Sequence, residues 1–133
     1  MAKRYTHLML FAVAAAVLVL PGCVSGNGYS DLEREPTAED ALPANLPDYA
    51  TADWEPGTAR FVGEAEDRRI YLAEGTDSPV CLLAYRSEKS WVGSCGSSNS
   101  TTSSGSFEVM VVSDNWPDEE GWTRVGENVL VRD

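Results

Sequence analysis

Few residues in this 133-residue sequence have side chains suited to catalysis or covalent chemistry. It contains three cysteines, Cys23, Cys81 and Cys95, and a single histidine, His7. A thiolate can act as a nucleophile or a metal ligand, thiols can pair as disulfides, and histidine titrates near neutral pH, which suits it to acid and base catalysis. The chemistry open to the chain therefore depends on which thiols are free and on whether His7 stays in the working protein.

Cys81 and Cys95 lie in two apolar runs that are joined by a polar turn. The midpoint of the two cysteines falls on Glu88, the middle residue of that turn. An antiparallel hairpin centred on Glu88 sets the two cysteines opposite each other, with Cα atoms about 4.5 to 5.5 Å apart, a distance that a disulfide spans. Two alternatives stay open at this point: two free buried thiols, or a bridge between strands that are not neighbours.

The same hairpin register predicts other cross-strand neighbours. It sets Leu83 opposite Gly93 and Tyr85 opposite Trp91, all on the face that carries the cysteines. The chain-entropy estimate for a bridge that closes a loop of this length, residues 81–95, is about 3 kcal/mol. Because cores of such small domains supply only roughly 3 to 5 kcal/mol, a disulfide here is expected to matter for stability.

The third cysteine follows a segment with the features of an export signal. Lys3 and Arg4 precede an uncharged and almost wholly apolar run at residues 8–20. A membrane-spanning helix needs roughly 20 apolar residues, whereas a secretory signal needs roughly 7 to 15. The alanines at 12–16 lie inside the run, too early for an ordinary signal-peptidase site. The run therefore predicts a signal peptide that is cut near Cys23.

The tetrapeptide Leu20-Pro21-Gly22-Cys23 resembles the lipobox of bacterial lipoproteins. In that family the cysteine sulfur takes a diacylglycerol by a thioether bond, and cleavage just before the cysteine makes it the new N-terminus. The sequence departs from the family at Pro21, where Ala, Ser or Thr is usual. The resemblance implies lipid attachment at Cys23 and a position on the outer, extracytoplasmic face of the cell membrane. The other interpretation is an ordinary cysteine in a poorly ordered tail.

Cleavage before Cys23 would change both the charge and the chemistry of the chain. Residues 1–22 include His7 and two of the ten basic residues, so the formal charge changes from −11 to −13. Such a chain would repel nucleic acids and anionic lipids. Without histidine, and with Cys81 paired to Cys95, it has no residues for a Ser-His-Asp triad, a cysteine nucleophile or a typical zinc site. No cofactor is therefore expected.

Carboxylates remain available for catalysis. Glycosidases need only a pair of them, about 5 to 10 Å apart across a groove. A carboxylate-based enzyme acting on the cell wall or another glycan is therefore the competing interpretation. We nevertheless predict a protein that is not an enzyme, because a β domain of this size offers little depth for a substrate cleft.

An acidic turn at residues 114–120 carries the oxygen ligands that calcium prefers. Its candidate ligands are Asp114, Asn115, Asp118, Glu119 and Glu120. Their spacing does not match the EF-hand loop, so a solvated turn is the preferred interpretation and no metal site is predicted. The tryptophans at 116 and 122 are expected to form local core rather than an exposed platform for sugar or peptide.

The chain is expected to have three parts: the signal peptide (1–22), an acidic proline-containing tether (23–56) and a small β domain (57–133). The tether contains eight acidic residues and one basic residue, and self-repulsion and proline stiffness extend such a segment. Tyr49 and Trp54 are expected to mark where it begins to pack onto the domain.

Short apolar runs separated by turn residues predict about six antiparallel strands, arranged as a small sheet, sandwich or barrel with one disulfide. The runs cover residues 60–65, 69–73, 80–85, 91–95 and 107–112, with further strand character at 125 and 129–131. The polar run at 96–106 is expected to be a mobile surface loop.

Two predictions about side-chain faces follow from these strands. A two-residue turn at residues 67–68 would set Ala65 opposite Ile70 and gather Phe61, Ile70 and Leu72 on one face. Alternation in the later strand 107–112 likewise places its residues 107, 109 and 111 together.

The segments YLAEG, VCLLAY and WVGSCG, within residues 58–96, resemble small exported lipoproteins of high-GC Gram-positive bacteria. That resemblance implies no activity. The chain is also too short for the two lobes of a typical solute-binding transport component. The sequence thus predicts a lipoprotein held to the membrane by a diacylglyceryl anchor on Cys23, with a non-catalytic binding module of unknown ligand.

Overall fold

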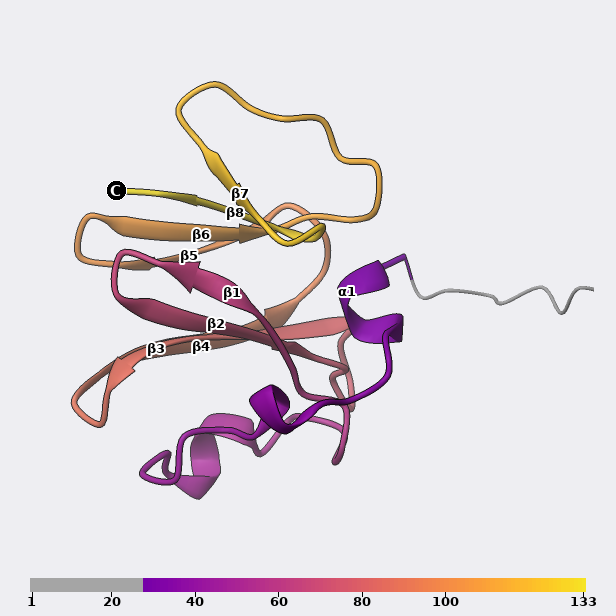
Figure 1. Cartoon of the computed structure of the whole chain (residues 1–133), viewed down its shortest axis with the longest axis vertical. Coiled ribbons are helices and arrows are strands. Elements are labelled where there is room, and N and C mark those ends of the chain that lie inside the picture. Colours follow the sequence, from indigo (N-terminus) through magenta and orange to yellow (C-terminus); the bar gives the residue numbers. More distant parts are fainter. Residues whose placement is uncertain (1–27) are drawn as a thin grey trace, which may run out of the picture.

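Two stacked antiparallel sheets make up the protein, which we describe from a computed structural model covering residues 28–133 (Figure 1). The first sheet contains, in spatial order, β1 (Arg60–Ala65), β2 (Arg68–Ala73), β3 (Val80–Ser87) and β4 (Ser90–Gly96). The second contains β5 (Ser100–Ser104), β6 (Phe107–Val111), β8 (Val129–Arg132) and β7 (Thr123–Val125). The predicted mainly β class with one disulfide is confirmed, with eight strands instead of six. The expected signal peptide and Cys23 lie outside the described residues.

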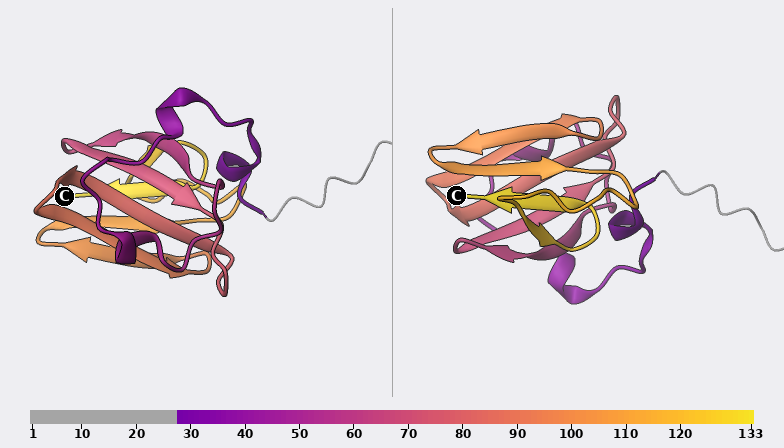
Figure 2. Two further views of the ribbon diagram at one scale, coloured as in Figure 1. Left: turned by 90° about the horizontal axis from the view of Figure 1, so that it is seen from below. Right: turned by 90° about the horizontal axis from the view of Figure 1, so that it is seen from above.

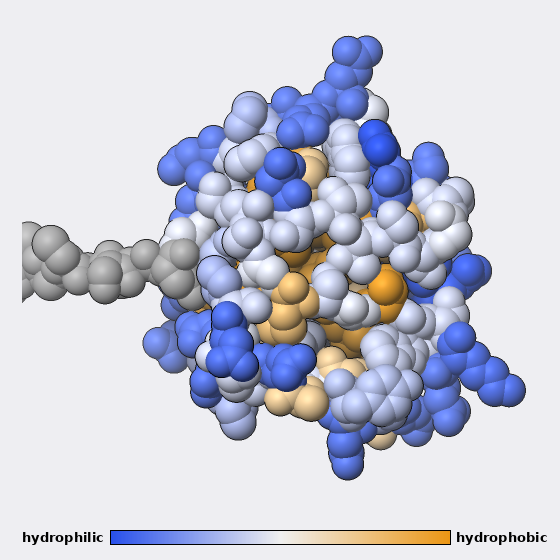
Figure 3. Space-filling model, turned by 180° about the vertical axis from the view of Figure 1, so that it is seen from behind, coloured by the Kyte–Doolittle hydropathy of each residue, from blue (hydrophilic) through white to orange (hydrophobic). Residues whose placement is uncertain are grey.

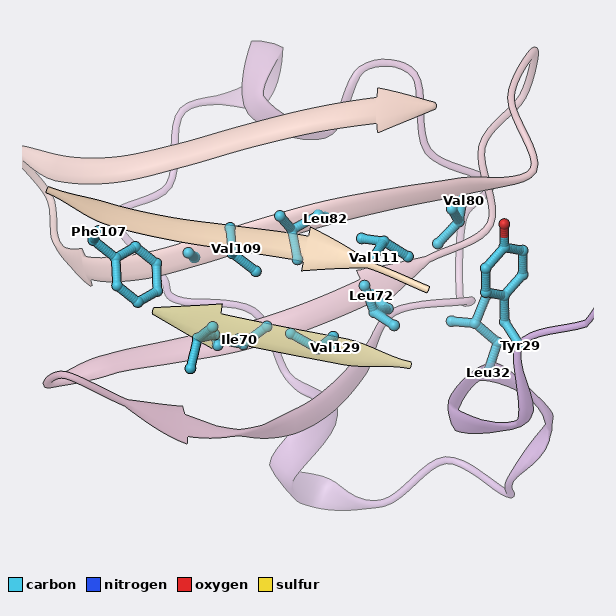
Figure 4. Packing of buried hydrophobic residues seen from close by; sticks show 12 residues of the cluster. Tyr29, Leu32, Ile70, Leu72, Val80, Leu82, Phe107, Val109, Val111 and Val129 are labelled. Carbon is cyan, nitrogen blue, oxygen red and sulfur yellow. The ribbon is translucent and has the colours of Figure 1, made fainter. Parts of the chain in front are cut away.

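The main core lies between the two sheets, where alternate residues of facing strands meet. The first sheet contributes Ile70, Leu72, Val80, Leu82 and Ala84, and the second contributes Phe107, Val109, Val111, Val129 and Val131. The predicted alternation in the strand that begins at Phe107 is therefore confirmed. Tyr29 and Leu32 close one end of this core and Phe107 lies toward the other (Figure 4).

The N-terminal segment packs along the sandwich from its first described residues. It contains α1 (Ser30–Glu33), η1 (Ala38–Asp40) and η2 (Asp48–Thr51). Seen from below, the segment lies across the strands of the first sheet (Figure 2, left). Packing was expected to begin at Tyr49 and Trp54. It begins instead at Tyr29 and Leu32, both buried, because two apolar side chains in a polar segment are enough to dock it.

The outer faces of both sheets are also covered, which explains why several strands are apolar on both sides. On the first sheet, Tyr71, Ala73, Cys81 and Leu83 pack beneath Trp54, Leu42 and Leu46 of the N-terminal segment. On the second, Met110, Val112 and Leu130 pack beneath Trp116 and Trp122 of the β6–β7 connection. The two tryptophans therefore pack against a local core, as expected.

The first hairpin differs from the prediction by one turn position. Its two turn residues are Glu66 and Asp67, with φ values of 50° and 58°, so that Ala65 pairs with Arg68. Positive φ at both positions is the geometry of the tight hairpin turn that matches strand twist. The expected turn at 67–68 was wrong because no glycine marks the position.

A bulge in β1 then changes which face Phe61 occupies. The pairing shifts between Phe61 and Gly63, where one extra residue on β1 faces β2. Phe61 consequently pairs with Tyr71, with ring centroids 5.6 Å apart, on the outer face of the sheet. The expectation that Phe61 shares a face with Ile70 and Leu72 is wrong.

The run predicted to be a mobile loop forms an edge strand. Within it, β5 pairs with β6 over all five of its residues. The hydroxyls of Ser94 and Thr102 lie 2.5 Å apart and link β4 to β5 where the two sheets meet. Composition alone missed this strand because its side chains bury little apolar area.

A buried carboxylate fastens the N-terminal segment to the open edge of β1. Asp40 accepts hydrogen bonds from the guanidinium of Arg34 and from the backbone N–H groups of Thr37 and Phe61. Arg34 also donates to the carbonyl of Phe61, at 2.8 Å. Together, Arg34 and Asp40 satisfy both outward-facing backbone groups of that residue, which an edge strand otherwise leaves unpaired.

Candidate functional site

The predicted pairing of the two β-domain cysteines is confirmed. Cys81 and Cys95 form a disulfide across β3 and β4, with Cα atoms 4.0 Å apart, and they face each other in the ladder. Both alternatives, free thiols and a bridge between non-neighbouring strands, are thereby contradicted. The predicted neighbours, Leu83 opposite Gly93 and Tyr85 opposite Trp91, are also present. Cys81 is buried, whereas Cys95 is exposed on the outer face.

A pocket of about 260 Å³ opens beside the exposed end of this bridge. Its lining includes Tyr49, Asp53 and Trp54 from the N-terminal segment and Trp91, Ser94 and Cys95 from β4. The remaining lining residues, Ala50 and Gly93, have little or no side chain and leave the space open. We refer to this site as the aromatic pocket.

Each wall of the aromatic pocket has a local structural cause. Tyr49 lies on η2, which follows Pro47 directly. Trp54 is buried and makes an isolated β-bridge with Gly75, which fixes the end of the N-terminal segment against the first sheet. Trp91 is positioned by the pairing of β3 with β4, the same register that sets Cys81 opposite Cys95. The rings of Tyr49 and Trp91 are 5.8 Å apart between centroids, inclined at 43°.

The ionisable groups of the aromatic pocket carry one sign of charge at neutral pH. Asp53 is the one acidic residue of its lining, and no lysine, arginine or histidine lines it. The side chain of Tyr49 is 74% exposed, more than any other large hydrophobic side chain within residues 28–133. The pocket thus combines aromatic rings with a single carboxylate.

The acidic turn at 114–120 uses several of its side chains in structural contacts. Asp114 accepts hydrogen bonds from the backbone and hydroxyl of Ser30 and from Asn128. Burial alone would raise the pKa of Asp114, but these hydrogen bonds outweigh it and the pKa is lowered. Asp118 pairs with Arg124 at 2.8 Å. Within residues 28–133, no group of three or more Asp, Glu, Cys or His side chains is placed to hold a metal ion.

The same network docks α1 onto the second sheet. Asn128 is fully buried, donates to Asp114 and to the carbonyl of Val112, and accepts from the backbone of Asp31. The Asp31 carboxylate accepts from two backbone N–H groups, at 127 and 128. Burial nevertheless raises the pKa of Asp31, and these hydrogen bonds offset only part of that effect.

A larger hollow of about 590 Å³ lies where the edges of β1 and β7 approach each other. Glu64 and Glu66 line it together with Arg124 and Arg132. Glu64 is paired with Arg69 at 3.1 Å. The aromatic pocket, for its part, offers one carboxylate rather than a facing pair. The carboxylate-based enzyme stays a prediction of the sequence alone.

Sequence reasoning missed the aromatic pocket because its two walls come from segments that were assigned to different parts of the chain. Tyr49 was placed in the tether and Trp91 in the β domain. The available signal was the pair of aromatic residues, Tyr49 and Trp54, in an otherwise acidic segment. Their spacing of five residues suits a short helical turn that returns to the sheet surface.

No helix within residues 28–133 has the length and apolar character needed to cross a membrane. No protein-family model, no curated protein and no solved structure matches this chain.

Proposed function

We propose that this chain is an extracytoplasmic lipoprotein, anchored through Cys23, whose β domain is a non-catalytic binding module. The lipobox resemblance supports the anchor, and the aromatic pocket supports the binding role. In the sequence, the proposed anchor at Cys23 precedes Gly28, where the described fold begins, by five positions. The domain would then lie near the membrane surface, with only a few residues between it and the lipid.

The observation that carries the binding role is the exposure of Tyr49. The side chain of Tyr49 is 74% exposed, so its burial contributes little to the stability of the fold. Its backbone is nevertheless held in η2, and its ring lies beside that of Trp91. Rings presented in this way stack on ligands at low entropic cost, because few torsions must be frozen. The face in Figure 3 is largely hydrophilic, with smaller apolar areas between the polar side chains.

Replacing the anchor residue should change where the protein is found. We expect Cys23→Ala to move the chain from the membrane fraction to the soluble fraction or the medium, because two acyl chains are what make membrane attachment stable. Ser25→Ala, two residues away, is the matched control and should stay with the membrane. Fractionation followed by immunoblotting measures both. A Cys23→Ala chain that lacks residues 1–22 and still stays wholly in the membrane fraction would refute lipid anchoring.

The binding role predicts a response at Trp91. We expect its indole NMR signal to shift saturably with at least one of three probes: a basic peptide, a neutral peptide or a neutral amino-sugar disaccharide. Tyr49→Ala should weaken that response while leaving stability within about 0.5 kcal/mol, because the side chain is exposed. Trp116, which donates to Glu119 within the β6–β7 connection and packs on the second sheet, supplies an internal control. If none of the three probes shifts Trp91, the aromatic pocket is not a binding site.

A further inference from the structure

The aromatic pocket has the chemistry of a cation-binding site. Its two accessible rings, Tyr49 and Trp91, present negative π faces, and its lining has the Asp53 carboxylate and no base. Ammonium and guanidinium groups are attracted to such faces within about 6 Å of a ring centroid. Because the two centroids are 5.8 Å apart, one cation can lie within that range of both rings.

The charge around the pocket favours the same class of ligand. The segment 28–56, which supplies Tyr49 and Asp53, contains eight acidic residues and one basic residue, Arg34. That base is engaged with Asp40, away from the lining of the pocket. The net negative charge of this segment raises the local concentration of cationic ligands and speeds their association. A carboxylate or phosphate ligand would be repelled.

A neutral sugar fits the lining less well. Sugar recognition uses ring stacking, but it also needs donors and acceptors that match several hydroxyl groups. Among the lining residues, only Asp53 and Ser94 have non-aromatic polar side chains with oxygen atoms, and there is no asparagine, glutamine or arginine. An isolated cation needs only the rings and one counter-charge.

We infer that the aromatic pocket binds the ammonium or guanidinium group of a basic side chain presented by a protein or peptide partner. This inference rests on the proposed binding role and names its ligand class. The rings of Tyr49 and Trp91 contact the cation, and Asp53 supplies its counter-charge. A flexible peptide segment can reach the pocket because Tyr49 stands at an exposed edge of η2.

The inference is tested with capped pentapeptides, Gly-Ser-Lys-Ser-Gly and its norleucine counterpart, and with tetramethylammonium chloride. Each is titrated into the full chain in detergent micelles while the Trp91 indole signal is followed by NMR. We expect a saturable shift with the lysine peptide, little or none with the norleucine peptide, and weaker binding at high salt. Tyr49→Ala should lower the affinity about threefold to fivefold, as the loss of one exposed cation–π contact implies.

A pair of charge-matched variants separates the local carboxylate from the general negative field. Asp53→Asn should weaken binding of the lysine peptide severalfold, whereas Glu120→Gln, an equal change of charge in the β6–β7 connection, should not. Equal effects of the two variants would overturn the role of Asp53. If tetramethylammonium binds and the lysine peptide does not, the occupant is a small cation and not a peptide.

The experiment distinguishes two hypotheses: that the aromatic pocket binds a ligand at all, and that this ligand is a cation. If the norleucine peptide or the disaccharide shifts Trp91 as strongly as the lysine peptide, and Tyr49→Ala weakens that shift, the pocket binds ligands but not through a cation. The binding role then stands and the present inference falls. If no probe shifts Trp91, both fall together, whatever Cys23→Ala shows about the anchor.

Discussion

Breaking the bridge between Cys81 and Cys95 is expected to lower the free energy of unfolding by about 3 kcal/mol, the chain-entropy estimate for a loop of this length. The estimate applies because the two cysteines are separated by 14 positions. The bridge holds the ends of that loop together in the unfolded chain and so lowers its conformational entropy. Urea denaturation of the wild type and of Cys95→Ala, followed by tryptophan fluorescence, measures the difference. Cys95 is the better site to replace because it is exposed, whereas Cys81 is packed beneath Trp54.

The double variant Cys81→Ala/Cys95→Ala distinguishes the cross-link from side-chain packing. Either single variant removes the whole bridge, so the double variant should be only slightly less stable than Cys81→Ala. Reduced wild type should resemble Cys95→Ala, because it loses the same covalent bond. Additive losses in the double variant, or an unfolding curve that does not respond to reductant, would contradict a stabilising role for the bridge.

Loss of the bridge should also reach the aromatic pocket. Ser94 and Cys95 line the pocket at the open end of the β3–β4 hairpin, whereas Trp91 lies next to its turn. A hairpin released at its open end frays more readily there than near its turn. The NMR response of Trp91 to the lysine peptide is therefore expected to weaken in Cys95→Ala even where the domain remains folded.

The part of the fold that could be predicted from sequence is the part where two independent patterns agree. In the β3–β4 hairpin, the cysteine spacing and the apolar runs imply the same register, and the structure has that register. In the β1–β2 hairpin only the apolar pattern was available. The turn at Glu66 and Asp67 has positive φ without glycine, and the bulge before Gly63 reverses the face of Phe61. Neither feature has a strong local sequence signal.

The N-terminal segment and β5 were missed for a related reason. Both have compositions typical of extended or mobile chain, rich in acids and prolines in one case and in serine and threonine in the other. Their structure comes from contacts that composition does not reveal: Tyr29 and Leu32 enter a main core formed by residues distant in sequence, and β5 forms a hairpin with β6, the next strand along the chain. The aromatic pocket depends on the first of these dockings, so it could not be predicted before the segment was known to fold back.

Asp40 is the residue whose replacement should most disturb that docking. Asp40→Ala is expected to lower the free energy of unfolding by about 3 kcal/mol, because it leaves two backbone donors and a guanidinium without their acceptor. The carboxylate is nearly buried while Arg34 is 38% exposed, so the estimate lies toward the low end for a broken buried pair. The matched control is Glu39→Ala, an exposed neighbour, which should change stability by no more than about 0.5 kcal/mol.

The pH dependence of stability provides a sharper test of the same contact. The hydrogen bonds from Arg34 hold the pKa of Asp40 well below its usual range, against the opposing effect of burial. The unfolded chain therefore binds a proton at higher pH than the folded one, so the contribution of Asp40 is fully present at neutral pH. It is lost progressively as the pH falls below about 4. The stability gap between the wild type and Asp40→Asn should thus be largest at pH 7 and narrow in acid.

Urea denaturation at several pH values between neutral and about 2.5 measures that gap directly. Glu39→Gln removes an equal charge from an exposed position and should give a small gap that changes little with pH. A gap for Asp40→Asn that stays constant into acid would mean that the ionised carboxylate contributes nothing specific. If the gap narrows as expected, the charge on Asp40 holds the N-terminal segment to β1, and acid should loosen the wall that carries Tyr49 before the sheets themselves separate.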